Sequence, residues 1–454
     1  MKINLLLDHR TILANQAQPV NFALQFRADN SDTPRSKPAA FCVVLDQSGS
    51  MQGKPLQYAK EATCLAIRNM RREDEFALVL FQSSAQVLIP LQPCNDKQRL
   101  LDLVNKINPG GSTNLTGGWM LGRDELKKAP TEASRLLLLL SDGLLNVGLV
   151  DPIQVRQIVA NGLEADAIRT SALGFGDNYD EKLLADLASA TNGQFYDADS
   201  PEKLPGIFTH ELDGLQKLAI QNLRIRLKKL DFCESFELVS GYPGIDLPDG
   251  RKEFAVGDLV SDEERVVCFA LAVFPLPWAE GAPVVSLQGE KLLELEILYD
   301  EIGESGIVSK TNQQIVRVQA TPNPEEVKVD ETVVHWVSMQ RAGLTLKQAT
   351  DEIAGGSPYK AKLILEQAIQ VLSQSGSKPR VGEAVQMLKD LLAQISQGPV
   401  SSRDLKAQMM RQFYARRSSS RQTPGPGPVP PPLPPPGNLP PTTDPGKGNP
   451  GPVA

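Results

Sequence analysis

Side chains that carry oxygen gather at two places in this sequence, each directly after a run of apolar residues. Asp46, Ser48 and Ser50 follow the run FCVVL, and Asp142 follows the run RLLLLL. The alternate spacing of the first three can turn their oxygens toward one point, which is the kind of cluster that a hard cation such as Mg²⁺ requires. We therefore expect these two segments to meet in one divalent-cation site.

A third segment, GGSTNLTGG, lies between the other two and offers the hydroxyl of Thr113 or that of Thr116. It reads as a glycine-rich turn that opens a helix. None of the three segments supplies a histidine or a thiolate. Two carboxylates among neutral hydroxyls leave a bound Mg²⁺ or Mn²⁺ incompletely neutralised, so we expect the cation to attract an acidic group from outside the chain.

Two other interpretations of the same residues remain open. Asp46 and Asp142 can serve only as caps of turns or helices, with the neighbouring serines as N-caps. The chain can also be a metal-dependent phosphohydrolase, because Asp46-Gln-Ser48 is similar to the start of a phosphatase loop. Against the enzyme, a serine stands where such a loop would carry its second carboxylate, and no convincing lysine with a paired aspartate follows.

Histidines and cysteines do not indicate a second reactive site. The three histidines are far in sequence from the oxygen-bearing segments, so a serine nucleophile has no evident base; they are His9, expected in a sandwich strand, His210 and His335. The cysteines are odd in number and show no CxxC spacing, which indicates buried free thiols; they are Cys42, Cys64, Cys94, Cys233 and Cys268. We expect binding chemistry, with no catalytic residue.

The segments that must position the cation site alternate between apolar runs and helical patterns. From residue 39 to residue 218, continuous apolar runs such as FALVLF and RLLLLL are separated by amphipathic stretches such as QYAKEATCLAIRNM. Runs of that kind are typical of strands buried on both faces of a parallel sheet, with helices on either side. Since ligands of open α/β sheets bind at the carboxyl ends of the strands, the oxygen-bearing loops fall at the expected edge.

The rest of the chain predicts three further parts. Residues 1–38 and 219–322 contain short alternating strands, which predicts one β-sandwich interrupted by the inserted α/β domain. Residues 323–416 show the period of three or four amphipathic helices, which predicts a small bundle. Residues 417–454 are dominated by proline and predict a disordered tail, either a solvated linker or a ligand for an aromatic groove on a partner.

Composition excludes several classes of partner. The 454 residues carry a net charge of −7 with acids and bases interspersed, so we expect neither nucleic acid nor an anionic membrane as a main partner. The N-terminal MKINLLLDHR lacks the features of a secretory signal, and no run of about twenty apolar residues occurs that would span a membrane. These features predict a cytoplasmic protein.

Taken in order, the three motifs resemble the metal ion-dependent adhesion site of von Willebrand factor A domains. They read Asp46-Gln-Ser48-Gly-Ser50, Gly-Ser-Thr113-Asn and Ser-Asp142-Gly, and the similarity extends over about residues 40 to 218. The resemblance implies a doubly wound, mostly parallel sheet with one antiparallel edge strand, AQVLIPL. It also implies that Ser48 and Ser50 are direct ligands, that Thr113 engages on binding, and that the two aspartates act largely through waters.

The resemblance further implies a function in protein binding. A bacterial, intracellular scaffold or adaptor would use Mg²⁺, or alternatively Mn²⁺, to hold an Asp or Glu of a partner protein. By analogy with other members of the family, the partner is an ATPase or a stress-signalling protein. Besides the phosphohydrolase, a membrane-associated adhesin or channel-related subunit remains an alternative.

Overall fold

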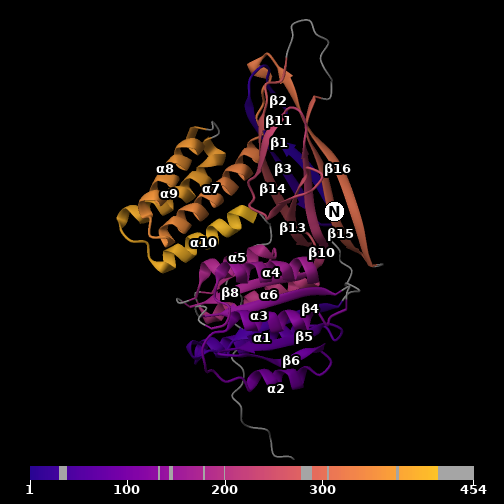
Figure 1. Ribbon diagram of the computed structural model, residues 1–454, viewed down its shortest axis with the longest axis vertical. Helices are drawn as coiled ribbons and strands as arrows, with labels where there is room; N and C mark the ends of the chain where they lie inside the picture. The colour runs from indigo at the N-terminus through magenta and orange to yellow at the C-terminus, as the bar shows by residue number, and fades with distance from the viewer. Residues whose placement is uncertain are drawn as a thin grey trace, which may run out of the picture.

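The computed structural model describes nine stretches of the chain, residues 1–29, 38–130, 133–142, 147–176, 179–198, 200–277, 289–303, 306–374 and 378–417. These stretches form an α/β body, a β-sandwich beyond one end of it, and a helical bundle that lies beside the sandwich (Figure 1). The predicted disordered tail falls almost wholly on residues 418–454, which lie outside the described residues.

A six-stranded sheet forms the middle of the α/β body, in the order β6-β5-β4-β7-β8-β9. All neighbouring strands are parallel except β6, which is antiparallel to β5 at the edge, as predicted for AQVLIPL. The strands are β4 (Ala39–Asp46), β5 (Glu75–Phe81), β6 (Ala85–Pro93), β7 (Ser134–Ser141), β8 (Ile168–Phe175) and β9 (Phe195–Ala198).

Helices cover both faces of this sheet, which explains why its strands are apolar without alternation. In β7, Leu136, Leu138 and Leu140 pack into the core on one face, and Leu137 and Leu139 into the core on the other. The first face is covered by α1 (Lys54–Asn69), α2 (Lys97–Asn105) and α6 (Leu204–Gln216), the second by α3 (Leu115–Leu126), α4 (Pro152–Asp166) and α5 (Glu181–Ala190). Two short 3₁₀ helices are η1 (Gly49–Met51) and η2 (Pro201–Lys203).

The β-sandwich consists of two sheets that share one apolar core. Their orders are β1-β3-β14-β11 and β12-β13-β10-β15-β16-β2. Since β1 to β3 precede the α/β body in sequence and β10 to β16 follow it, the predicted insertion is confirmed. The strands are β1 (Lys2–Leu7), β2 (Thr11–Leu13), β3 (Gln18–Arg27), β10 (Leu218–Lys229), β11 (Cys233–Leu238), β12 (Gly244–Asp246), β13 (Lys252–Val260), β14 (Glu264–Val273), β15 (Glu290–Gly303) and β16 (Gly306–Thr321).

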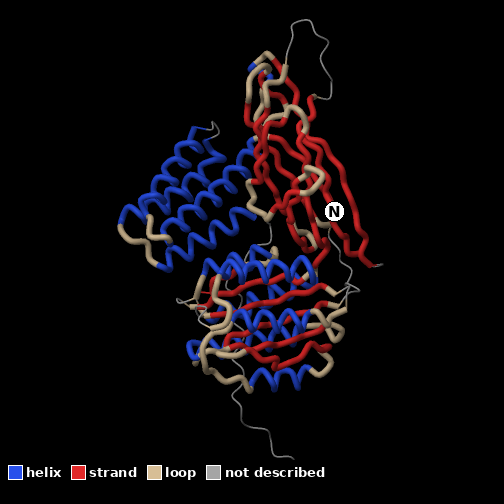
Figure 2. The backbone as a smooth tube through the Cα atoms, in the orientation of Figure 1, coloured by secondary structure: helices blue, strands red, loops and turns tan. Residues whose placement is uncertain are grey.

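The helical bundle packs against both other bodies (Figure 2). Its elements are η3 (Pro324–Glu326), α7 (Glu331–Ala354), α8 (Pro358–Gln374), α9 (Lys378–Gln397) and α10 (Ser402–Arg417). On the sandwich side, the Ser240 hydroxyl hydrogen-bonds the Gln340 side chain of α7 over 2.5 Å. On the α/β side, the Lys406 ammonium of α10 lies 3.9 Å from the centre of the Tyr179 ring. Within the described stretches, no helix has the length and apolar character needed to cross a membrane.

Candidate metal centre

The first loop of the predicted site begins where β4 ends, at Asp46. The backbone N–H of Ser48 donates to Oδ1 of Asp46 over 2.8 Å, which folds the loop back on the end of its own strand. The Gln47 N–H donates to the Phe81 carbonyl over 2.9 Å, which ties the loop to the neighbouring strand β5. Asp46 and Ser48 are buried, whereas Ser50 is exposed at the edge of the sheet.

Side-chain hydrogen bonds join this first loop to the end of β7. The hydroxyls of Ser48 and Ser50 lie 3.0 Å apart, and the Ser50 hydroxyl donates to Oδ1 of Asp142 over 2.8 Å. The hydroxyl of Ser141 donates to Oδ2 of Asp46 over 2.9 Å. Four of the five predicted residues, Asp46, Ser48, Ser50 and Asp142, therefore belong to one connected group.

The glycine-rich segment supplies the third loop, which carries Thr113 and lies against the first. Gly49 N–H donates to the Gly111 carbonyl over 3.1 Å, and Gly110 N–H donates to the Gln47 carbonyl over 2.7 Å. Gly111 has φ +83°, and a Cβ there would come within 2.6 Å of the Gln82 side chain in the turn after β5, so this position of the third loop favours glycine. Thr113 is buried in this loop, two residues after Gly111.

Thr116, the alternative to Thr113, has a different role. It lies in the first turn of α3, and its hydroxyl donates to the Leu149 carbonyl over 2.8 Å. This hydrogen bond holds the Thr116 hydroxyl against the loop that leads into α4. The geometry thus favours Thr113 as the threonine of the cation site.

Ser141 is the residue at this edge that sequence reasoning missed. It is fully buried, and its hydroxyl donates a hydrogen bond to Asp46. A signal was present, because a serine that ends a run of five leucines places a hydroxyl at the carboxyl end of a buried strand.

None of the three histidines lies on the elements of the cation site. His210 is on α6, where its ring packs edge-on against Tyr196 at 6.3 Å, and His335 is on α7. The prediction that His9 lies in a sandwich strand was wrong in detail, because it follows β1 and forms an isolated bridge with Val329. All five cysteines are buried free thiols, as predicted.

Both carboxylates of the site are buried, and their surroundings raise the pKa of each. Burial raises the pKa of Asp46 to about 6, with a further contribution from the charge of Asp142, and burial also raises the pKa of Asp142. Among the described residues, no lysine, arginine or histidine forms an ion pair with either carboxylate. A divalent cation would supply the missing positive charge.

The donor set suits a hard cation. Nowhere in the described stretches do three or more His, Cys, Asp or Glu side chains gather in a metal-binding group, so hydroxyls must contribute at this edge. Carboxylate and hydroxyl oxygens with room for an outside ligand are what Mg²⁺ accepts, whereas the thiolates and imidazoles typical of structural zinc are missing from the group. The residues therefore fit a Mg²⁺ site.

Comparison with known proteins agrees with this geometry. The sequence profile of the von Willebrand factor type A domain matches residues 42–210. These residues form a von Willebrand factor type A (VWA) domain. The match includes Asp46, Ser48, Ser50, Thr113 and Asp142, and it ends within α6, the last helix of the α/β body.

Relatives of the chain differ in how much of it they share. A protein of Synechocystis sp. is 24% identical over 348 residues, which are 73% of this chain and 79% of that protein. Inter-alpha-trypsin inhibitor heavy chain H1 of Mesocricetus auratus is 30% identical over 209 residues, but this chain spans only 22% of its length. The solved structure of a von Willebrand factor type A protein from Catenulispora acidiphila has a TM-score of 0.67 at 16% identity and covers 91% of this chain and 96% of its own. That similarity extends over all three bodies and shows a shared fold.

Proposed function

We propose that this chain is a protein-binding scaffold whose VWA domain holds Mg²⁺, or Mn²⁺, and through it captures an Asp or Glu of a partner protein. The residues proposed to form the site are Asp46, Ser48, Ser50, Thr113 and Asp142. The observation that carries the proposal is the connected group of two buried carboxylates and two serine hydroxyls with no basic partner among the described residues.

Each residue has a role that follows from its contacts. Ser48 and Ser50 present their hydroxyl oxygens 3.0 Å apart, which suits neighbouring ligands of one cation. Both oxygens of Asp46 already accept hydrogen bonds, from Ser48 N–H and the Ser141 hydroxyl, so this carboxylate acts through charge and bridging water. Asp142 accepts a hydrogen bond from the Ser50 hydroxyl at Oδ1, and we assign it the same role.

Binding of an acidic group follows from the coordination that this set of oxygens leaves open. A bound divalent cation supplies a positive charge and a coordination position that a carboxylate oxygen of the partner can fill. Ser50 is exposed at the mouth of the site, so the partner can approach from the open edge of the sheet. At the same edge α10 contacts the loop after β8, where the Lys406 ammonium donates to the Gly176 carbonyl over 3.3 Å, whereas Ser50 in the loop after β4 is exposed.

A pull-down from cell extract with the full chain tests the proposal. We expect a set of proteins that is retained with Mg²⁺ and lost with EDTA, with Asp46→Ala and with Ser48→Ala. Ser396→Ala on α9, which also removes a serine hydroxyl but lies in the bundle, serves as the matched control and should retain the set. Retention of the same proteins in EDTA and in both site variants would refute metal-dependent capture.

A further inference from the structure

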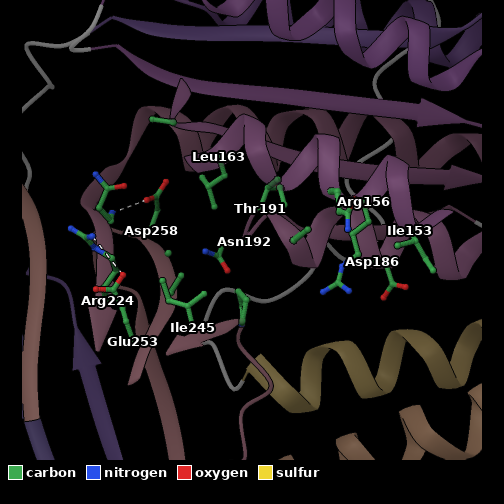
Figure 3. Close-up of a pocket in the computed structure, with 18 of the residues that line it drawn as sticks. Ile153, Arg156, Leu163, Asp186, Thr191, Asn192, Arg224, Ile245, Glu253 and Asp258 are labelled. Carbon is green, nitrogen blue, oxygen red and sulfur yellow. Dashed lines mark hydrogen bonds and ion pairs between the residues drawn. The ribbon is translucent and has the colours of Figure 1, made fainter. Parts of the chain in front are cut away.

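A groove of about 1000 Å³ separates the VWA domain from the β-sandwich (Figure 3). One wall consists of α4 and α5. Its residues extend from Pro152 to Ala167 along α4, and from Asp180 to Asn192 along α5. The other wall consists of β10, β12 and β13 of the sandwich. The groove therefore runs along the full length of α4 and is at the upper end of the volumes typical of ligand sites.

Each wall presents an apolar side chain that is largely exposed. Ile153 on α4 is 70% exposed, and Ile245 on β12 is 57% exposed. Both line the groove (Figure 3). β12 is the edge strand of its sheet, and all three of its residues are exposed. Exposed aliphatic side chains gathered in one concave surface are typical of a binding site.

The charged residues of the groove are mostly compensated within the chain. Arg224 lies 3.7 Å from Glu253, and Lys182 lies 3.3 Å from Asp351 of α7. An uncharged ligand suits such a surface better than a charged one, because it leaves these pairs in place. Arg156 and Gln157 on α4 add side-chain N–H donors to the wall, which favours a ligand rich in carbonyl oxygens.

One segment of this chain has that chemistry. Eleven of the eighteen residues 424–441 are prolines, and no charged residue occurs from Gln422 to Thr443. Proline has a carbonyl acceptor but no N–H, so a proline-rich backbone seeks donors and offers none at those positions. Val429, Leu433 and Leu439 add aliphatic side chains that can cover exposed isoleucines.

The start of this segment is close to the groove along the chain. α10 ends at Arg417 and packs on α5, which is one wall of the groove, with its last turns directed toward the junction of the three bodies (Figure 1). Met410, in the middle of α10, packs against the same core as α5. The six residues 418–423 that follow can span about 20 Å when extended.

We propose that the proline-rich segment 424–441 of this chain binds in the groove between α4, α5 and β12, where its aliphatic side chains cover Ile153 and Ile245. The segment thereby links the end of the bundle to the junction of the VWA domain and the sandwich. This inference is independent of the metal site.

Spin labels on the full chain test the proposal, and the burial of all five native cysteines leaves only introduced thiols to react. One label is attached at Ile245→Cys and the other at Leu433→Cys, with a second pair that places the groove label at Gln157→Cys. We expect a narrow, short distance between the labels for both pairs. A control pair with Val308→Cys, at an exposed position on β16, should give a longer distance.

A charge in the groove gives the second readout. Ile153→Glu should broaden the distance distribution, and excess synthetic peptide of residues 424–441 should do the same. Val371→Glu, at a 63% exposed position on α8, is the matched control and should leave the distribution narrow. A broad distribution for both groove pairs in the parent chain would overturn the proposal. So would a short distance that arises only between two singly labelled chains, since the groove would then hold the tail of a second copy.

Discussion

The two edges of the VWA sheet hold buried charge in opposite ways. At the carboxyl edge, Asp46 and Asp142 are held by serine hydroxyls, and no basic side chain among the described residues pairs with them. At the amino edge, Arg169 of β8 lies 3.8 Å from Glu211 of α6 and 3.8 Å from Asp258 of β13. At the second edge a cation of the chain itself faces the carboxylates and serves stability, whereas we propose that the first edge takes its cation from outside.

Breaking the amino-edge group should give the largest effect on stability. Arg169→Met leaves Glu211 fully buried without its cation, and removing one partner of a buried ion pair costs roughly 3–5 kcal/mol. We expect a marked fall in the urea midpoint of the VWA domain. Arg169→Met combined with Glu211→Gln should recover much of the loss, because the orphaned charge is removed. An unchanged urea midpoint in Arg169→Met would show that Arg169 does not stabilise the amino edge.

Removing the negative charge of Asp46 at the carboxyl edge should raise the stability of the metal-free protein. Burial raises the Asp46 pKa from its ordinary 3.8 to about 6, so the folded state holds the proton more tightly than the unfolded state. Metal-free stability should therefore fall as the pH rises from about 4 to about 6, by about 2–3 kcal/mol for this group.

Asp46→Asn should remove this pH dependence and unfold later than the parent chain at pH 7 without metal. Thermal unfolding in EDTA across this pH range measures both effects. Saturating Mg²⁺ should reverse the order and stabilise only the parent chain. An Asp46→Asn protein that is less stable than the parent in EDTA at pH 7 would show that the charge is compensated internally.

A smaller effect is expected at Ser141, which positions Asp46 without being a proposed ligand. Ser141→Ala removes the 2.9 Å hydrogen bond, and loss of about 1 kcal/mol corresponds to roughly fivefold weaker Mg²⁺ binding. Ser141→Thr keeps the hydroxyl and should bind within about twofold of the parent. Calorimetric titration measures both affinities. Equal weakening by both variants would indicate a packing defect instead of a lost hydrogen bond.

The smallest effect is expected for an exposed pair between two bodies. Lys182 on α5 lies 3.3 Å from Asp351 on α7, and both side chains are substantially exposed. Pairs of this kind contribute at most about 1 kcal/mol, because water screens them. Lys182→Met should therefore shift the urea midpoint only slightly. A shift as large as that of Arg169→Met would show that the exposed ion pair contributes as much stability as the buried one.

How far the sequence could predict these features depends on how local their causes are. The runs FCVVL and RLLLLL predicted two buried strands whose carboxyl ends carry Asp46 and Asp142, because burial on both faces leaves a continuous apolar pattern. The amino-edge group could not be predicted in that way. Arg169, Glu211 and Asp258 are single charges far apart in sequence, and only the packing of α6 and β13 against β8 brings them together.

The interdomain groove illustrates the same limit. The alternating pattern predicted a sandwich around the inserted domain, but Ile153 and Ile245 each look like ordinary members of a helix and a strand. Their exposure results from how α4 and β12 are placed on either side of the groove, which no periodicity encodes. Ser141 lies between these two cases. Its place at the end of a strand could be predicted from the sequence, but its hydrogen bond to Asp46 depends on the packing of β4 beside β7.

The most direct test of the carboxyl edge is a titration of the full chain with Mn²⁺, followed by electron paramagnetic resonance of the unbound ion. The metal-site account predicts one bound Mn²⁺ per chain, displaced by excess Mg²⁺, lost in Asp46→Ala and Ser48→Ala, and retained in Ser396→Ala and in Arg169→Met at a temperature where that variant is folded. Binding of one Mn²⁺ per chain with unchanged affinity in Asp46→Ala and Ser48→Ala would contradict it.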